Sequence, residues 1–245
     1  MAIASLSRDI ELEIAFNVRH LGGYQTRTGK PTSPDFIRSA SLHRLTAGSI
    51  DRLRDLGVTT IVDLRSTVER ERDVTPDVTA AGIRVVHAPV FEQDASPVGL
   101  EPEFFGFAKV YEHFLERGKD AYRTLFETMA RDDGAVLFHC AAGKDRTGVA
   151  AALLLELAGV PATAIVHDYC RSAELLKPML ALWEPRMQER GMSPERAAQL
   201  MASNAEDMAA TLAYLGARWG DAEGYLQAIG VSDADISAVR ARMCG

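Results

Sequence analysis

The stretch from Gly134 to Gly159 constrains the fold more than any other part of the chain. It begins with a near-continuous apolar run, Ala135-Val-Leu-Phe-His139, passes through a turn, and ends in a helical pattern from Thr147 to Ala158. A short run that is apolar on both faces is typical of a central strand in a parallel sheet, because helices cover both faces of such a strand. The stretch therefore predicts a strand-turn-helix unit in the middle of an α/β sheet.

Other segments have the patterns that such a sheet needs. Thr46 can cap a short helix that Gly57 ends, and everything after Pro161 has a helical pattern. The remaining patterns predict strands at 12–18, 36–39, 58–63 and 83–87, and helices at 103–117 and 119–131. We therefore expect one domain over residues 1–245, with an α/β core at 12–160 and a helical C-terminal portion at 161–245.

The composition argues against several classes of partner. The net charge is −7 and no run of lysines and arginines stands out, so nucleic acid and anionic membranes are not expected partners. The longest later apolar run, Val149 to Leu155, is too short to span a bilayer, and the N-terminus does not have the pattern of a signal peptide. We expect a cytoplasmic protein, with export lacking a recognisable signal as the alternative.

Metal and nucleotide sites have no support in the sequence. The six histidines show no HxH or HExxH spacing, and the three cysteines are too scattered for a disulfide framework or a metal knuckle. Gly143-Lys144 is followed by Asp145, and the earlier glycine of a nucleotide-binding loop is missing. We therefore expect no metal and no cofactor, and a reducing compartment.

The turn after the central strand has the residues of a thiol-based anion site. Cys140 lies at the predicted strand end and Arg146 six residues later, just before the helix. A cysteine becomes an effective nucleophile in an electropositive setting, which a helix N-terminus and an arginine supply together. The guanidinium of Arg146 can offer two parallel donors to the oxygens of a phosphoryl group. Cys140 is therefore predicted to be the nucleophile of a phosphatase, and Arg146 its phosphate clamp.

The rest of the loop, 139–148, suits phosphate binding through its backbone. Gly143 allows an unusual backbone angle at the apex, the Thr147 hydroxyl can hydrogen-bond the thiolate, and His139 is expected to order the loop. The backbone N–H groups expected to point inward at the phosphoryl group are those of Ala141, Ala142, Gly143 and Lys144.

A buried, inert cysteine is the alternative reading of Cys140, because free cysteines are among the most buried residues. The full string His-Cys, five residues, Arg-Thr-Gly argues against it, and neither Cys170 nor Cys244 has an arginine six residues on. These two cysteines are expected to be structural. The other readings left open are a phosphate-binding module without turnover, and rhodanese-like or arsenate-reductase-like thiol chemistry.

At this point the chain resembles a family, the bacterial tyrosine phosphatases with the signature HCxxGKDRTG, which are also described as atypical lipid phosphatases. The resemblance spans almost the whole chain. One departure is His20, where such proteins usually have aspartate. Besides the loop, the matching segments are Phe16-Asn-Val-Arg-His-Leu-Gly-Gly-Tyr24, Phe36-Ile-Arg-Ser39, Leu42-His-Arg-Leu45, Val62-Asp-Leu-Arg65, Asp168-Tyr169, Arg171-Ser172, Gly224-Tyr-Leu and Ala228-Ile-Gly230.

The resemblance implies a phosphocysteine mechanism without a metal, on a four- or five-stranded, mostly parallel sheet flanked by helices. It also implies that Asp145 protonates the leaving oxygen; a salt bridge or a helix N-terminal charge is the alternative role. Asp94, in the long loop from Pro89 to Pro102, is a weaker acid candidate. Asp63 and Arg65 close a predicted strand and either line the site or form an ion pair that supports the loop.

The resemblance also bears on the substrates. Phosphorylated protein and phosphoinositides are the expected partners, with inorganic phosphate as product or inhibitor. Lys144 adds a second cation to the loop, which suits substrates that carry more than one phosphate, although it could equally be a solvated side chain. The sequence does not separate protein from lipid substrates.

Overall fold

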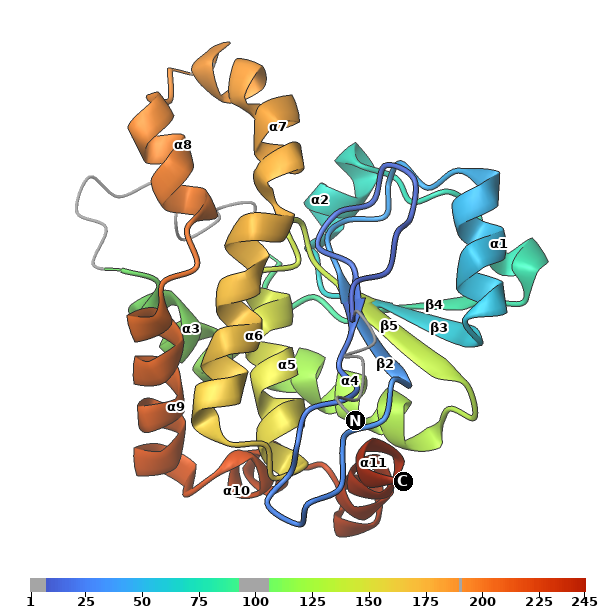
Figure 1. The fold of residues 1–245 in the computed structure, drawn as a ribbon, viewed down its shortest axis with the longest axis vertical. Coiled ribbons are helices and arrows are strands. Elements are labelled where there is room, and N and C mark those ends of the chain that lie inside the picture. The colour runs from blue at the N-terminus through green and yellow to red at the C-terminus, as the bar shows by residue number, and fades with distance from the viewer. Residues whose placement is uncertain (1–7, 93–105, 190) are drawn as a thin grey trace, which may run out of the picture.

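The structure, a computed structural model, describes residues 8–92, 106–189 and 191–245, and its centre is a twisted sheet (Figure 1). In the described residues this sheet has five strands in the order β1-β2-β5-β3-β4. Neighbouring strands are parallel except for β1, which pairs with β2 in the antiparallel direction. The strands are β1 (Arg19–His20), β2 (Phe36–Ser39), β3 (Val58–Asp63), β4 (Arg84–His87) and β5 (Ala135–His139).

Side chains of the central strands alternate between two hydrophobic cores. On β5, Val136 and Phe138 belong to the larger core, whereas Leu137 between them belongs to the smaller one. This alternation is the two-residue period of a strand. All three side chains are fully buried, which explains why the strand is apolar without interruption. The prediction of a central strand at 135–139 is therefore confirmed.

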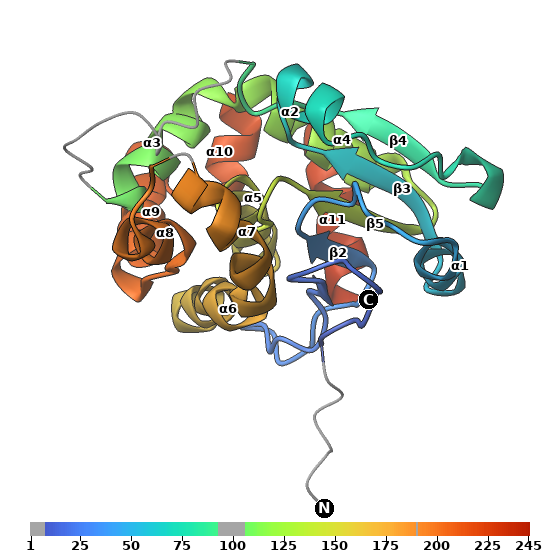
Figure 2. The ribbon, with the colours of Figure 1, turned by 90° about the horizontal axis from the view of Figure 1, so that it is seen from above.

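Helices cover both faces of the sheet. Helix α1 packs on the side of the smaller core, and most of the other helices pack on the side of the larger one (Figure 2). Up to β5 the helices are α1 (Ala47–Asp55), α2 (Thr67–Arg72), the 3₁₀ turn Thr79–Ala81, α3 (Phe107–Arg117) and α4 (Lys119–Arg131). After β5 they are α5 (Arg146–Leu157), α6 (Ala162–Leu175), α7 (Lys177–Glu189), α8 (Pro194–Met201), α9 (Ala205–Trp219), α10 (Ala222–Ala228) and α11 (Asp233–Cys244).

The helical C-terminal portion is confirmed in the described residues. It folds back against the sheet domain, because α11 packs on α4 and the N–H of Ser33 donates to the carbonyl of Met243 at 2.7 Å. Helices α7 and α8 form a pair that projects beyond the carboxyl ends of the strands (Figure 1). No helix in the described ranges is long and apolar enough to cross a membrane.

The predicted strand at 12–18 is wrong. Ile14 and Asn17 have φ angles of 58° and 54°, which an extended strand does not allow. The segment instead forms an irregular loop whose side chains Leu12 and Ala15 pack against the smaller core. Its apolar residues therefore reflect packing on the core rather than pairing with a neighbouring strand. The other predicted strands are present, and most of the loop at 89–102 lies outside the described residues.

Candidate active site

The loop that connects β5 to α5 carries the predicted nucleophile and the predicted phosphate clamp. Cys140 follows the last residue of β5, and Arg146 is the first residue of α5. Both side chains are buried, with Cys140 only 1% exposed. The loop thus lies at the carboxyl edge of a parallel sheet, where ligands bind in open α/β folds, and at the N-terminus of a helix.

Two glycines allow the loop to fit its surroundings. Gly143 has a φ of 66°, and a Cβ atom built there would overlap the carbonyl oxygen of Ser39 at the end of β2. No side chain fits at this position, so the loop apex packs directly on the backbone of β2. A Cβ at Gly148 would lie only 3.2 Å from the ring of Tyr169 on α6. Because glycine has no Cβ, α5 can pack closely on α6 at this point.

Backbone carbonyls of the loop are hydrogen-bonded on the side away from solvent. The side-chain amide of Asn17 donates to the carbonyls of Ala142 and Gly143, at 3.0 Å each. The Gly143 carbonyl also accepts a hydrogen bond of 2.7 Å from Nη2 of Arg38. Asn17 and Arg38 are 2% and 0% exposed. The apex of the loop is therefore held by buried donors.

These donors belong to a buried ionic cluster that the sequence analysis did not foresee. Asp168 on α6 forms ion pairs with Arg19 at 2.9 Å and with Arg38 at 2.5 Å, and Tyr24 donates to it at 2.8 Å. Arg19 donates in turn to the Oδ1 atom of Asn17. Burial alone would raise the pKa of Asp168, but the two arginines hold it well below its usual range.

Arg146 forms a two-pronged ion pair with Glu69 on α2. Its Nη1 and Nη2 atoms lie 2.6 and 2.8 Å from the two carboxylate oxygens of Glu69, and its guanidinium lies 5.1 Å from the ring of Phe91. Burial would raise the pKa of Glu69, but Arg146 lowers it to about 2. Glu69 also closes a capping box with Ser66. The Ser-x-x-Glu spacing reveals this cap in the sequence, but not the contact with Arg146.

Asp145 is positioned by one of its two carboxylate oxygens. Oδ1 accepts a hydrogen bond of 2.6 Å from the hydroxyl of Tyr111 and lies 3.3 Å from Nζ of Lys144. In the described residues, Oδ2 has no hydrogen-bond partner. The salt bridge considered for Asp145 is therefore present, and one oxygen is still available to carry a proton. The sequence analysis did not single out Tyr111, because a tyrosine in a predicted helix gives no signal of a contact with Asp145.

Lys144 is fully buried, so its reading as a solvated side chain is wrong. Its Nζ donates to the carbonyls of Leu200 and Ala202 at 2.7 and 2.8 Å, and lies 3.5 Å from the centre of the Phe107 ring. Burial lowers its pKa, although Asp145 acts in the opposite direction. The ammonium group thus bonds the last carbonyls of α8, groups that a helix leaves unpaired.

His139, Asp63 and Arg65 meet behind the loop. Asp63 and Arg65 form a buried ion pair of 2.7 Å, and Nε2 of His139 lies 3.8 Å from Asp63. Burial lowers the pKa of His139, although Asp63 acts in the opposite direction. Arg65 also donates to Ser41 at 2.9 Å. Of the two roles considered, the ion pair is the one that the geometry supports.

The Thr147 hydroxyl is buried and has no hydrogen-bond partner in the described part of the chain. Such a group is uncommon in a native structure, and the predicted hydrogen bond from Thr147 to the sulfur of Cys140 is not formed here. Cys170 and Cys244 are partly buried against the larger core. Asp94 lies outside the described residues.

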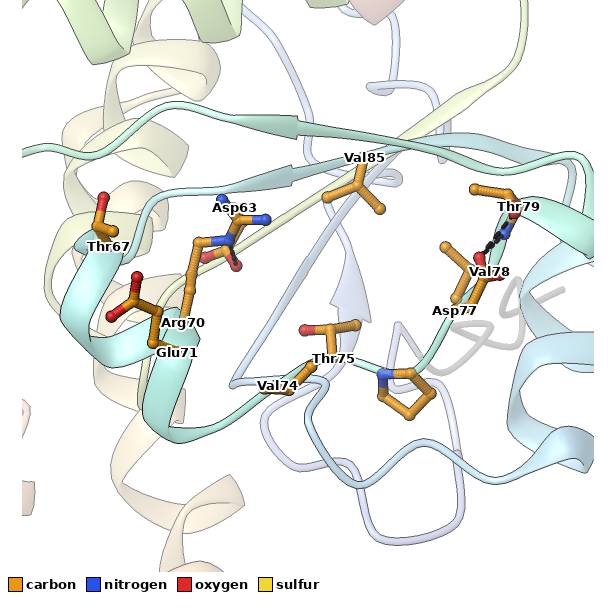
Figure 3. A pocket seen from close by; sticks show the side chains of 11 residues that line it. Asp63, Thr67, Arg70, Glu71, Val74, Thr75, Asp77, Val78, Thr79 and Val85 are labelled. Atoms are coloured by element: carbon orange, nitrogen blue, oxygen red, sulfur yellow. Dashed lines mark hydrogen bonds and ion pairs between the residues drawn. The ribbon is translucent and has the colours of Figure 1, made fainter.

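A pocket of about 400 Å³ lies between α2 and the segment 74–79 that follows it (Figure 3). The Arg70 side chain extends from α2 to Asp63, with 3.4 Å between Nε and Oδ2. None of the described residues that line it belongs to the loop 139–148.

The described residues contain no group of three His, Cys, Asp or Glu side chains that could hold a metal ion.

The strand order defines a mostly parallel α/β protein whose cysteine loop joins the central strand to the N-terminus of α5, and comparison with known proteins gives the class of such a protein. The sequence profile of the tyrosine phosphatase family matches residues 10–245. This chain therefore belongs to the tyrosine phosphatase family.

The relatives of the chain cover most of its length. A tyrosine-protein phosphatase of Nostoc commune is 36% identical over 85% of this chain and 74% of its own. The triple specificity protein phosphatase PtpB of Mycobacterium tuberculosis is 30% identical over 96% of this chain and 99% of its own. Among solved structures, TpbA of P. aeruginosa in complex with pTyr is 21% identical, with a TM-score of 0.37, over 82% of this chain and 88% of its own.

Proposed function

We propose that the protein hydrolyses phosphate monoesters through a phosphocysteine intermediate on Cys140. Phosphotyrosine is the first expected substrate, and phosphoserine, phosphothreonine and phosphoinositides are further ones. The observation that carries the proposal is the seven-residue loop itself, which starts at Cys140 directly after the central strand and ends at Arg146, the first residue of α5. Membership of the tyrosine phosphatase family supports it.

In the first step the Cys140 thiolate attacks phosphorus in line with the ester oxygen. The S–P bond forms as the P–O bond to the leaving group breaks, and Asp145 gives its proton to the leaving oxygen. Arg146 and the loop N–H groups bind the equatorial oxygens, whose charge they stabilise in the transition state. The products of this step are an alcohol or phenol and phosphocysteine.

In the second step a water molecule attacks the phosphocysteine. Asp145, now a carboxylate, takes a proton from this water, and the P–S bond breaks to give inorganic phosphate and the Cys140 thiolate. The hydroxyl of Thr147 is buried and unpaired in the described residues, and we expect it to turn and donate a hydrogen bond to the sulfur as negative charge returns there. Cys140, Asp145 and Arg146 thus each have a role in these two steps.

Apolar side chains and one exposed cation lie beside the loop. A small hollow of about 10 Å³ next to Ala141 is lined by Phe16, Met179 and Trp183, and by the exposed Arg44. The hollow is too small to enclose the ring of phosphotyrosine, so we expect a substrate to lie over it, where Arg44 can meet a further anionic group. The PtpB relative is named a triple specificity phosphatase, which supports a range wider than phosphotyrosine.

The decisive experiment is hydrolysis of an aryl phosphate by the purified chain in the presence of a metal chelator. Wild type should turn over, and Cys140→Ser should lose turnover but still bind inorganic phosphate, because only the nucleophile is lost. Phosphate binding without turnover in wild type would indicate a binding module instead. Full activity of the serine variant, or a strict metal requirement, would exclude the mechanism.

A further inference from the structure

We propose that the buried cluster of Asn17, Arg19, Arg38 and Asp168 is a positioning device for the catalytic loop. It would set the orientation of the loop N–H groups that bind phosphate, a role that rests on the proposed function of the loop. None of these four side chains was assigned a part in the chemistry by the sequence analysis. The cluster lies on the protein side of the loop, behind its apex.

The argument begins with the geometry of the peptide unit. In a trans peptide the C=O of one residue and the N–H of the next lie in one plane and point in opposite directions. Donors that hold a carbonyl on one side of the loop therefore turn the following N–H to the other side. The orientation of the loop N–H groups can thus be inferred from the partners of the carbonyls.

Three successive carbonyls of the loop are held on its protein side. Ala141 accepts from the backbone N–H of Ser41 at 2.9 Å, and the next two carbonyls accept from Asn17 and Arg38. The N–H groups of residues 142, 143 and 144 are thereby turned toward the centre of the loop. Three N–H groups that converge in this way form a concave site for an anion.

The donors are themselves fixed in place. Asn17 adopts a left-handed backbone conformation, which asparagine tolerates better than most residues, and its Oδ1 atom accepts from Arg19. That contact also assigns the amide orientation, because it directs the NH₂ group of Asn17 at the loop. Asp168 joins Arg19 to Arg38, so both donors to the loop depend on one carboxylate.

The charges of the cluster favour an anion in the loop. Two arginines share one carboxylate, and although burial lowers the pKa of Arg38 to about 10, the group stays protonated at neutral pH. The excess positive charge lies directly behind the Gly143 carbonyl. The carboxylate partner of Arg19 is Asp168, so an aspartate at position 20 is not needed for that purpose. His20 instead accepts from the N–H of Gly22 at 3.1 Å.

The test measures binding of inorganic phosphate to the full chain by calorimetry, together with kcat and KM on an aryl phosphate. Asn17→Gly keeps the left-handed backbone but removes both donors, and Asn17→Asp keeps the size and the contact with Arg19 but cannot donate. Both variants should bind phosphate about 10- to 100-fold more weakly, the range expected when a hydrogen bond that serves a charged group is lost.

Thr60→Val is the matched control. It removes one hydrogen bond of a buried side chain, to Asp132, but Thr60 contacts neither the loop nor the cluster, so the variant should lower the melting temperature and leave phosphate affinity within about twofold. Equal phosphate binding by wild type and both Asn17 variants would overturn the proposal, as would an equal loss in Thr60→Val. A wild type that neither binds nor hydrolyses phosphate would refute the proposed function itself, and the positioning role with it.

Discussion

Glu69 and Arg146 lie 77 residues apart in the chain and are joined by two hydrogen bonds of 2.6 and 2.8 Å, which tie α2 to the first residue of α5. The carboxylate engages both terminal nitrogens of the guanidinium. Of the guanidinium donors that remain, Nε and the second N–H of Nη2 lie side by side and form a second edge that can bind two phosphate oxygens. Glu69 thus holds Arg146 in one orientation before any substrate arrives.

Glu69→Gln should lower kcat by about 10- to 100-fold, with a smaller change in KM. Glutamine can still close the cap with Ser66, but it loses the charge and one of the two strong contacts, so Arg146 is less well oriented. Steady-state kinetics on an aryl phosphate measures the effect. Glu71→Gln, on the exposed side of the same helix, is the control and should behave as wild type. A faster Glu69→Gln variant would instead show that Glu69 competes with phosphate for Arg146.

Asp145→Ala should slow the hydrolysis of esters with poor leaving groups by about 10²- to 10⁴-fold, and esters with good leaving groups much less. The reason is that a poor leaving group needs the proton that the free Oδ2 atom can deliver. A series of aryl phosphates with leaving groups of increasing basicity measures this dependence. If the dependence appears in Asp63→Asn and not in Asp145→Ala, the acid must be reassigned.

The ion pair of Asp63 and Arg65 should make the protein sensitive to acid. Burial alone would raise the pKa of Asp63, but His139 and Arg65 lower it to about 2 from the ordinary 3.8. Between about pH 4 and pH 2 the unfolded chain therefore binds more protons at this carboxylate than the folded protein does. The pair adds about 2 kcal/mol to the free energy of unfolding above pH 4, and this contribution disappears through that window.

Guanidinium unfolding of wild type and Asp63→Asn at pH 7, 4 and 3 tests this expectation. The variant should be less stable at pH 7 by about 3–5 kcal/mol, since Arg65 is left buried without a charged partner. The difference in the free energy of unfolding between the variant and wild type should become smaller as the pH falls. Asp120→Asn, whose carboxylate is exposed, should show no such change with pH. A difference that stays constant from pH 7 to pH 3 would contradict the assignment.

Local features of the fold could be predicted from the sequence because their signals are local. Apolar periodicity located β5, the spacing of Thr46 and Gly57 located α1, and the string from Cys140 to Arg146 located the loop. The segment 12–18 was misread because apolar side chains that pack on a core from a loop look the same, in one dimension, as those of a strand. The left-handed angle at Ile14 leaves no signal in the residue type, and the asparagine at position 17 tolerates such an angle without requiring it.

The partners of the loop could not be predicted because they come from distant parts of the chain. Arg38 and Asp168 are 130 residues apart, and Tyr111 and Asp145 are 34 residues apart. One sequence shows which residues are charged, but not which of them the tertiary structure brings together. The burial of Lys144 is the clearest case, because a lysine in a loop is usually exposed.

Lys144→Ala should lower kcat/KM on phosphotyrosine peptides and on phosphoinositides by similar factors, about 10-fold. The sequence had suggested a lysine that reads a second phosphate, but Nζ bonds the carbonyls of Leu200 and Ala202, and leaving them would break two hydrogen bonds. Its removal leaves these carbonyls without a hydrogen-bond donor, which costs about 1–3 kcal/mol. This cost destabilises the loop in the same way for both substrates.

Arg44→Ala is the matched comparison, because Arg44 is exposed in the pocket next to Ala141 and carries the same charge. An exposed cation at the rim can meet a second phosphate without giving up buried partners, so its loss should reduce kcat/KM on phosphoinositides more than on phosphotyrosine. Both variants are to be measured on both substrates at one ionic strength, since salt screens the rim charge. The opposite pattern, with selective loss in Lys144→Ala and an equal loss in Arg44→Ala, would show that Lys144 leaves α8 to bind the substrate.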